Sequence, residues 1–196
     1  MKTLLIASSN PGKIQELTAL LQDLDLLLVT PQQLGLQLNV EESGETYAEN
    51  AAKKASQHAL ASGLLTMADD SGLEVDVLGG APGVRSARYS PQPGATDADR
   101  RTYLLEKLKG YPPPWLAHFH CTVALVKLGR EAVFTVGNCY GEIIPKQRGS
   151  HGFGYDPIFL LTELGKTMAE LDMIEKNRLS HRARAVRAAI PLLTEM

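Results

Sequence analysis

Short apolar runs alternate with amphipathic segments along this chain, and the alternation predicts an α/β fold. Residues 4–7 and 26–29 are apolar runs of strand length. Between them, apolar residues recur at helical spacing over residues 13–21, which predicts a helix there. Strand and helix therefore alternate from the beginning of the chain.

Three further helices are expected, two of them from capping patterns. Thr46 is followed three positions later by a glutamate, and Thr96 by an aspartate, so each threonine can begin a helix as its N-cap. The first of these helices is alanine-rich and should end near Gly63, and the second should stop before the prolines at 112–114. A last helix is expected from Ser180 onward.

The remaining apolar runs predict a mixed sheet. Residues 65–68 are a short strand candidate, and residues 158–161 are another. Residues 116–128 and 132–144 flank a turn at Gly129 and predict an antiparallel hairpin. Because the earlier strands alternate with helices, we expect parallel and antiparallel strands in one sheet.

Composition and charge restrict the class of protein. The chain has 196 residues, of which 44% are hydrophobic and 21% are charged, as in ordinary globular domains. Since there is no internal repeat and no long linker, we expect one domain over residues 1–196 that is divided into lobes. The net charge of −2 argues against a large nucleic-acid footprint.

The sequence predicts a cytoplasmic protein that does not enter a membrane. The first apolar run covers only four residues before Ser8 interrupts it, which is too short for a signal peptide. Cys121 and Cys139 do not provide the disulfide framework that small secreted domains need. A reducing cytoplasm is the compartment that fits both observations.

The most informative chemistry of the chain follows the strand candidate at 65–68, in the segment Asp69, Asp70, Ser71 and Gly72. Adjacent carboxylates repel each other and lose hydration on burial unless a cation, a proton or a donor neutralises them. Such a pair therefore indicates Mg²⁺ and an activated water. A plain polar turn is the alternative, since all of these residue types favour turns.

A polar loop between the first strand and the first helix is suited to binding an anion. Gly12 allows close approach, Lys13 supplies charge, and N–H groups at the helix start point outward. The loop is not a Walker loop, because Ala7 replaces the required glycine and Ile14 the required hydroxyl. An ordinary turn with a solvated lysine remains the alternative. The candidate phosphate-binding residues are Ser8, Ser9, Asn10, Pro11, Gly12 and Lys13.

Two other loops carry groups that suit a nucleotide. Glu41 and Glu42 either add a magnesium ligand or simply favour the start of the next helix. In residues 152–157, glycines beside Phe153 let its flat ring stack on a base, and Asp156 can recognise an edge or a hydroxyl. A sharp turn with core aromatics is the alternative for this second loop.

Donor side chains gather where the last helix begins. Lysine and arginine neutralise phosphate charge, and histidine and arginine offer N–H donors to a phosphate or a carbonyl oxygen. A solvated helix face is the alternative. The residues concerned are Lys176, Ser180, His181 and Arg182.

Taken together and in this order, these segments resemble the inosine triphosphate pyrophosphatase family. The resemblance extends from Ile6 to about Leu193. The family pattern at the first loop is Thr-Gly-Asn-x-Gly-Lys, so Ser8 and Ser9 depart from it, and Ser9 lacks the backbone freedom of glycine. The matching segments are residues 8–13, Glu42, residues 69–72, 80–83, 152–157 and 180–182.

The resemblance implies a magnesium-dependent enzyme that hydrolyses ITP, dITP and XTP to the monophosphate and pyrophosphate, which keeps these nucleotides out of DNA and RNA. By similarity, Glu42 and Asp70 hold Mg²⁺, and Asp70 is also the general base for the attacking water. Ser71 would hydrogen-bond the phosphate chain. Lys13 and Lys176 are the candidates that neutralise its charge.

The resemblance also implies how the base is recognised. Phe153 would stack on the purine. Asp156, His181 and Arg182 would address its edge, where donors favour the 6-carbonyl of these bases over the amino group of adenine. The loop residues included in this substrate site are Phe153, Gly154, Tyr155 and Asp156.

The fold that the resemblance implies is an elongated mixed β-sheet flanked by helices, with two lobes and the active-site cleft between them. A homodimer is also implied. Two other functions remain as alternatives. One is a Maf-like nucleotide pyrophosphatase that acts on other nucleotides, and the other is a nucleotide sensor without catalysis, which would not need the acids at 42, 69 and 70.

Overall fold

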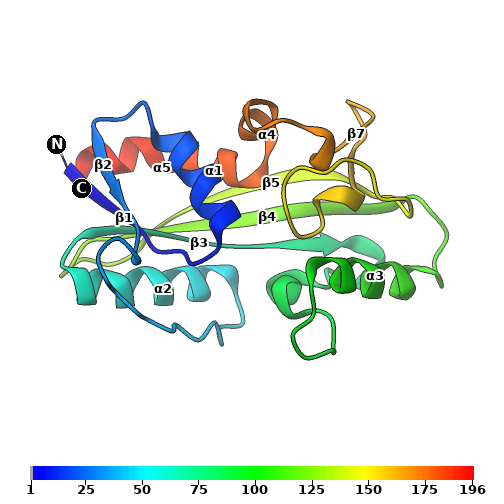
Figure 1. Ribbon diagram of the computed structural model, residues 1–196, viewed down its shortest axis with the longest axis horizontal. Helices are drawn as coiled ribbons and strands as arrows, with labels where there is room; N and C mark the ends of the chain where they lie inside the picture. The colour runs from blue at the N-terminus through cyan, green and yellow to red at the C-terminus, as the bar shows by residue number, and fades with distance from the viewer. Residues whose placement is uncertain (1) are drawn as a thin grey trace. The chain divides into compact units, whose positions relative to one another are not determined.

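The computed structural model describes residues 2–196 and contains a seven-stranded mixed sheet flanked by helices (Figure 1). The strands are β1 (Lys2–Ile6), β2 (Leu26–Val29), β3 (Leu65–Val75), β4 (Trp115–Val126), β5 (Val133–Ile143), β6 (Phe159–Leu161) and β7 (Lys166–Thr167). The α-helices are α1 (Pro11–Leu21), α2 (Tyr47–Ser62), α3 (Asp97–Leu108), α4 (Met173–Leu179) and α5 (His181–Glu195). The strand order is β2-β1-β3-β4-β5-β6-β7. The predicted α/β class is confirmed.

Both strand directions occur in the sheet, as the sequence predicts. β1 is parallel to its neighbours β2 and β3. β6 is antiparallel to its neighbours β5 and β7. The parallel strands belong to the part of the chain where strands alternate with helices, because a parallel connection needs a crossover of helical length.

The chain folds into two compact units, and each is built from separate stretches of sequence. Unit 1 contains the described residues up to Asp70, residues 121–137 and the chain from His181 onward. Unit 2 contains residues 71–120 and 138–180. β3, β4 and β5 each contribute residues to both units.

Unit 1 packs helices on both faces of its strands. Apolar side chains of α1 and α5 share one core with alternate residues of β1, including Leu4 and Ile6. Alanines of α2 form a second core with Ala7 and Ala68. Figure 1 shows α1 and α5 on one side of these strands and α2 on the other. Small side chains on α2 let this helix lie close to the strands.

β3 is longer than the sequence predicts, and this changes the setting of the two acids. The predicted strand ends at residue 68 and a turn follows, but β3 continues to Val75. Asp69 and Asp70 therefore lie in the middle of a strand, and the turn interpretation is wrong. The strand can continue through them because side chains from other elements neutralise or hydrogen-bond both carboxylates, as described below.

α2 and α3 begin where the capping patterns predict. The side chains of Thr46 and Thr96 each accept a hydrogen bond from the N–H of the acid three residues on. The side chain of that acid in turn accepts the threonine N–H. α1 instead begins at Pro11, before the predicted residue 13, because Asn10 caps it and proline suits the first helical position. Local capping signals thus locate the helix starts of both units.

Unit 2 has a separate apolar core. Leu104 and Leu108 of α3 pack with Trp115 of β4, Phe159 of β6 and other buried side chains.

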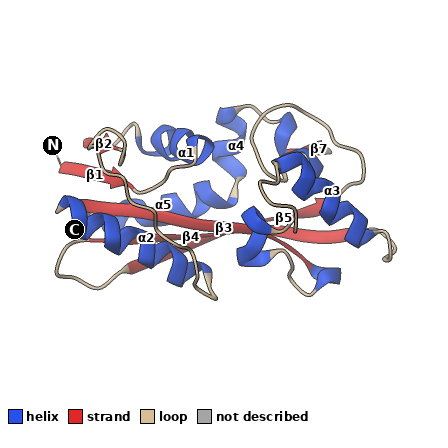
Figure 2. Ribbon diagram, turned by 60° about the horizontal axis from the view of Figure 1, so that its bottom comes forward, coloured by secondary structure: helices blue, strands red, loops and turns tan. Residues whose placement is uncertain are grey.

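Within the described part of the chain, no helix combines the length and the apolar character that crossing a membrane requires. Residues 30–46 form a loop between β2 and α2, drawn in tan in Figure 2, and this loop carries Glu42.

Candidate functional site

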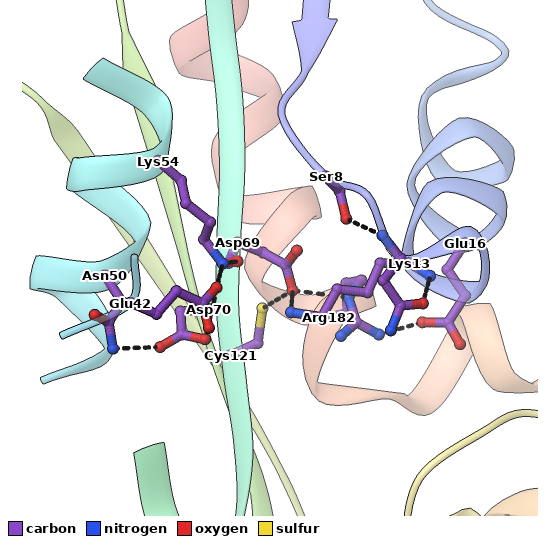
Figure 3. Close-up of polar contacts among 11 residues, drawn as sticks. Ser8, Lys13, Glu16, Glu42, Asn50, Lys54, Asp69, Asp70, Cys121 and Arg182 are labelled. Atoms are coloured by element: carbon purple, nitrogen blue, oxygen red, sulfur yellow. Dashed lines mark hydrogen bonds and ion pairs between the residues drawn. The ribbon is translucent and has the colours of Figure 1, made fainter. Parts of the chain in front are cut away.

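The candidate site of unit 1 is organised around Asp69 and Asp70 in the middle of β3. Figure 3 shows the two carboxylates on opposite sides of the strand, because successive residues of a strand point to opposite faces. Each carboxylate therefore meets different side chains. As a result, the two acids differ in their proton affinity and in what they can do.

Asp69 is 1% exposed and pairs with two cations. Lys13 Nζ lies 3.0 Å and Arg182 Nε 3.1 Å from its Oδ2. Burial opposes ionisation, but the charges of Lys13 and Arg182 outweigh it and hold the pKa of Asp69 well below its usual range. Asp69 is therefore a fixed negative charge rather than a base. Its Oδ1 is buried and has no hydrogen-bond partner among residues 2–196.

Arg182, near the start of α5, is enclosed by carboxylates and is only 1% exposed. Its Nε donates to Asp69, and its Nη1 donates to Glu16 of α1 (Figure 3). Burial disfavours its charge, but Asp69 and Glu16 outweigh this and raise the pKa of Arg182. The guanidinium thereby connects α5 with α1 and β3. Its predicted contact with a purine edge stays a prediction.

Asp70 faces α2 and the loop before it. Asn50 Nδ2 donates to Asp70 Oδ2 at 3.1 Å, and Asn50 Oδ1 accepts the Gly44 N–H at 2.8 Å. A Cβ on Gly44 would lie 2.8 Å from Asn50 Oδ1, so this close approach requires glycine. Burial raises the pKa of Asp70 above its ordinary value, and the nearby charge of Lys54 offsets this only in part. A carboxylate with a raised pKa is better able to accept a proton from water.

Lys54 is a site residue that sequence reasoning missed. Its Nζ lies 2.5 Å from Glu42 Oε1, 2.7 Å from the main-chain oxygen of Asp69 and 3.9 Å from Asp70 Oδ1. Burial alone would lower the pKa of Lys54, but the charges of Asp69 and Asp70 outweigh it and raise the pKa. The available signal was its spacing of four residues from Asn50, which places both side chains on one face of α2.

Glu42 and Asp70 converge on one cation, which in this structure is the ammonium of Lys54. Carboxylate oxygens around one point are the donors that hard divalent ions take. Among the described residues, no group of three or more His, Cys, Asp or Glu side chains has a metal-binding arrangement. A divalent ion here would therefore take two protein carboxylates and complete its shell with waters or phosphate oxygens.

The loop ahead of α1 is held by its own polar contacts. Ser8 Oγ accepts the Asn10 N–H at 3.2 Å, and Asn10 Oδ1 accepts the Lys13 N–H at 3.1 Å. Residues 9–11 are exposed, whereas the side chain of Lys13 turns toward Asp69. The loop thus presents its lysine at β3, and phosphate binding by this loop stays a prediction.

In unit 2, Phe153, Asp156 and Lys176 come together. Asp156 Oδ2 accepts the Phe153 N–H at 2.9 Å, and Lys176 Nζ donates to the same oxygen at 2.6 Å. Lys176 is 3% exposed, and its Nζ lies 5.0 Å from the centroid of the Phe153 ring, within cation–π range. The sequence assigns Lys176 to phosphate, whereas its charge meets Asp156 and an aromatic ring here. A Cβ on Gly152 would lie 2.0 Å from Asp156 Oδ2, so this cluster also requires glycine.

The remaining predicted residues have different surroundings. Tyr155 is buried and donates its hydroxyl to the main-chain oxygen of Ser86 at 2.9 Å, as a core aromatic does. Ser71 lies in β3, and His181 is the buried first residue of α5. In unit 1 the predicted residues are Ser8, Ser9, Asn10, Pro11, Gly12, Lys13, Glu42, Asp70, His181 and Arg182. In unit 2 they are Ser71, Phe153, Gly154, Tyr155, Asp156 and Lys176.

Known proteins resemble this chain over nearly its whole length. A dITP/XTP pyrophosphatase of Gloeobacter violaceus is 48% identical over 187 residues, which cover 95% of this chain and 92% of that protein. A dITP/XTP pyrophosphatase of Escherichia coli O157:H7 is 43% identical over 196 residues, and the match covers 98% of each chain.

Solved structures agree with these relatives. A HAM1 protein from Coxiella burnetii superposes with a TM-score of 0.90 at 40% identity and covers 100% of both chains. The Ham1 protein of Staphylococcus aureus superposes with a TM-score of 0.86 at 36% identity and covers 99% of both chains. The model of the Ham1 family matches residues 4–192. The family resemblance inferred from the sequence is confirmed, and the chain belongs to the Ham1 family.

Proposed function

We propose that this protein hydrolyses dITP, XTP and ITP to the nucleoside monophosphate and pyrophosphate, and thereby removes these nucleotides from the pool used for DNA and RNA synthesis. The proposal rests above all on the setting of Asp70. Burial raises the pKa of this carboxylate, and Glu42 and the ammonium of Lys54 lie beside it. Relatives that span nearly the whole chain are dITP/XTP pyrophosphatases, which supports the substrate class.

The cofactor that we propose is Mg²⁺, held by Glu42 and Asp70. The fit rests on two carboxylates that already converge on one cation, and on the preference of Mg²⁺ for carboxylate oxygens with retained waters. When bound, this ion neutralises phosphate charge and acidifies a coordinated water. The ammonium of Lys54 would remain a second positive charge beside the phosphates.

The side chains of unit 1 divide the chemistry. Asp70 orients a water molecule and accepts its proton, while the water oxygen bonds to phosphorus and pyrophosphate leaves with the bond electrons. Asn50 holds the carboxylate of Asp70 in place, because Asn50 Nδ2 donates to Asp70 Oδ2. Lys13 and Lys54 reduce the repulsion between the nucleophile and the polyanion. Ser71 follows Asp70 in β3 and is the first residue of unit 2, and it is the proposed hydroxyl donor to the phosphate chain.

A panel of nucleotides tests the proposal. The protein is incubated with Mg²⁺ and, separately, with ITP, dITP, XTP, ATP, GTP and dTTP, and pyrophosphate and monophosphate are quantified. We expect both products in equal amounts from the first three substrates and little turnover of the others. A preference for dTTP would indicate a Maf-like activity, and no release from any substrate would indicate a nucleotide sensor.

In unit 2, we propose that Phe153 stacks on the purine and that Asp156 addresses its edge. Replacing Phe153 with alanine is expected to raise the KM for dITP about 5- to 150-fold, because stacking on a base is worth about 1 to 3 kcal/mol. Steady-state kinetics checks this, with the exposed Leu164→Ala as a control outside the loop. An unchanged KM in Phe153→Ala would remove the ring from base recognition.

We also propose that the protein is a homodimer in the cytoplasm. Leu116 and Tyr140 of unit 2 expose large apolar side chains that association can cover. Cys121 and Cys139 are both free thiols, which a reducing compartment preserves. Light scattering after gel filtration measures the mass in solution, and a monomer mass at micromolar concentration would contradict the dimer.

A further inference from the structure

Two side chains of α3 hold the loop that carries Phe153. Asp97 Oδ2 accepts the Gly154 N–H at 2.7 Å, and Arg101 Nη1 donates to the Gly154 carbonyl oxygen at 2.6 Å. Both backbone polar groups of the residue after Phe153 are therefore bound by one helix. All of these residues belong to unit 2.

Two glycines give the backbone of this loop conformational freedom at Phe153, and within the loop Asp156 restrains it, because the Asp156 N–H donates to the Phe153 carbonyl oxygen at 3.2 Å. Gly152 and Gly154 flank Phe153 and have φ values of +74° and +60°. Glycine adopts such positive φ values easily, but it also adopts many other backbone conformations. On the other side of Phe153, its own N–H is bound by Asp156. The contacts from α3 supply the second restraint, so the peptide groups on both sides of the ring have fixed partners.

Asp97 and Arg101 are in turn held in place. Asp97 uses its second oxygen, Oδ1, for an ion pair with Arg100 Nη2 at 2.5 Å, which leaves Oδ2 for the loop. Arg101 Nε donates to Gln147 Oε1 at 3.0 Å, which leaves Nη1 for the loop. Each side chain thus has a separate contact that sets its orientation.

These contacts contribute more to orientation than to stability. Both loop contacts are only partly buried, and the side chain of Asp97 is 40% exposed, so water can replace a lost loop contact at little cost in folding free energy. A variant that loses a loop contact should therefore still fold. The arrangement instead limits the positions that the Phe153 ring can take.

We propose that Asp97 and Arg101 are positioning residues for base recognition, which hold the Gly154 peptide so that the Phe153 ring is ordered before the nucleotide binds. The proposal rests on the proposed role of Phe153 in the function above. Ordering the loop in advance removes an entropic cost from binding. Loss of the tether should therefore weaken substrate binding more than it slows the chemical step, and only for ligands that carry a base.

Arg101→Met tests the proposal because it keeps the apolar stem and removes the donors. We expect the KM for dITP to rise about tenfold, in line with losing a charged hydrogen bond, while kcat changes less than about threefold. Asp97→Asn retains an acceptor for the Gly154 N–H and should lie between wild type and Asp97→Ala. Arg130→Met, at an exposed arginine between β4 and β5, is the matched control and should behave as wild type.

Two further measurements separate positioning from general damage. In a Phe153→Ala background, Arg101→Met should raise the KM no further, because there is no ring left to position. Inorganic tripolyphosphate, which has no base, should inhibit wild type and Arg101→Met equally. An unchanged KM in Arg101→Met, an additive effect in the double variant or weaker inhibition by tripolyphosphate would each overturn the proposal.

Calorimetric binding of inosine monophosphate makes the outcome independent of hydrolysis. Arg101→Met should weaken this binding about tenfold, because the ligand carries the base. If wild type binds it but does not hydrolyse dITP, XTP or ITP, the proposed function fails while the positioning role is still decided by this binding. If wild type neither binds nor hydrolyses, both proposals are overturned.

Discussion

Replacing Asp70 with asparagine is expected to lower kcat for dITP hydrolysis by at least about 100-fold, the effect of losing a general base. Asparagine has nearly the same shape and can still accept the hydrogen bond from Asn50. It cannot take a proton from water, and it is a poorer ligand for a divalent cation. The fold should remain intact, since burial of this carboxylate is itself unfavourable to its charged form.

Steady-state kinetics at saturating Mg²⁺ and dITP measures this effect, and circular dichroism with urea unfolding checks the fold. Asp23→Asn, at an exposed aspartate after α1, is the matched control and should keep wild-type kcat. A kcat near the wild-type value in Asp70→Asn would remove Asp70 from both the base and the metal roles.

Replacing Arg182 with methionine is expected to reduce the free energy of unfolding by about 3 to 5 kcal/mol, because it leaves buried charges without their partner. Of the two cations that form ion pairs with Asp69, Lys13 would remain, and Glu16 would lose the guanidinium that the structure places beside it. Urea unfolding measures the change. Arg130→Met, at an exposed arginine between β4 and β5, should change it by less than about 0.5 kcal/mol.

A second variant separates the buried charges from simple loss of packing. Glu16→Gln combined with Arg182→Met removes one of the stranded carboxylates, so the double variant should cost less than the sum of the two single changes. Strict additivity, or a loss below about 1 kcal/mol in Arg182→Met, would mean that this buried ion pair does not hold α1, α5 and β3 together.

The starts of α2 and α3 were predictable because their signals are local. Thr46 and Thr96 cap the helices that they were expected to cap, and each makes its contact within the first turn. The end of β3 was not predictable in this way. Aspartates favour turns locally, but Lys13 and Arg182 from other elements meet Asp69, and Asn50 meets Asp70, so the strand continues.

The candidate site was predicted only in part, because some of its residues have local signals and others depend on contacts between distant segments. Its acids could be chosen from the sequence because adjacent carboxylates are costly without a function. Lys54 was missed because a lysine on an alanine-rich helix normally indicates a solvated face. Its spacing from Asn50 was the available signal, but the contacts with Glu42 and Asp69 depend on how α2 packs. The depth of Arg182 was equally hidden, since its partner Glu16 is far away in the sequence.

A competition in one tube tests the proposed activity most directly. The protein is mixed with Mg²⁺ and equal concentrations of dITP, XTP, dATP and dGTP, and every nucleotide is followed by chromatography over time. We predict that dITP and XTP are converted to their monophosphates with matching pyrophosphate while dATP and dGTP remain. Loss of all four at similar rates, or earlier loss of dATP and dGTP, would contradict the account.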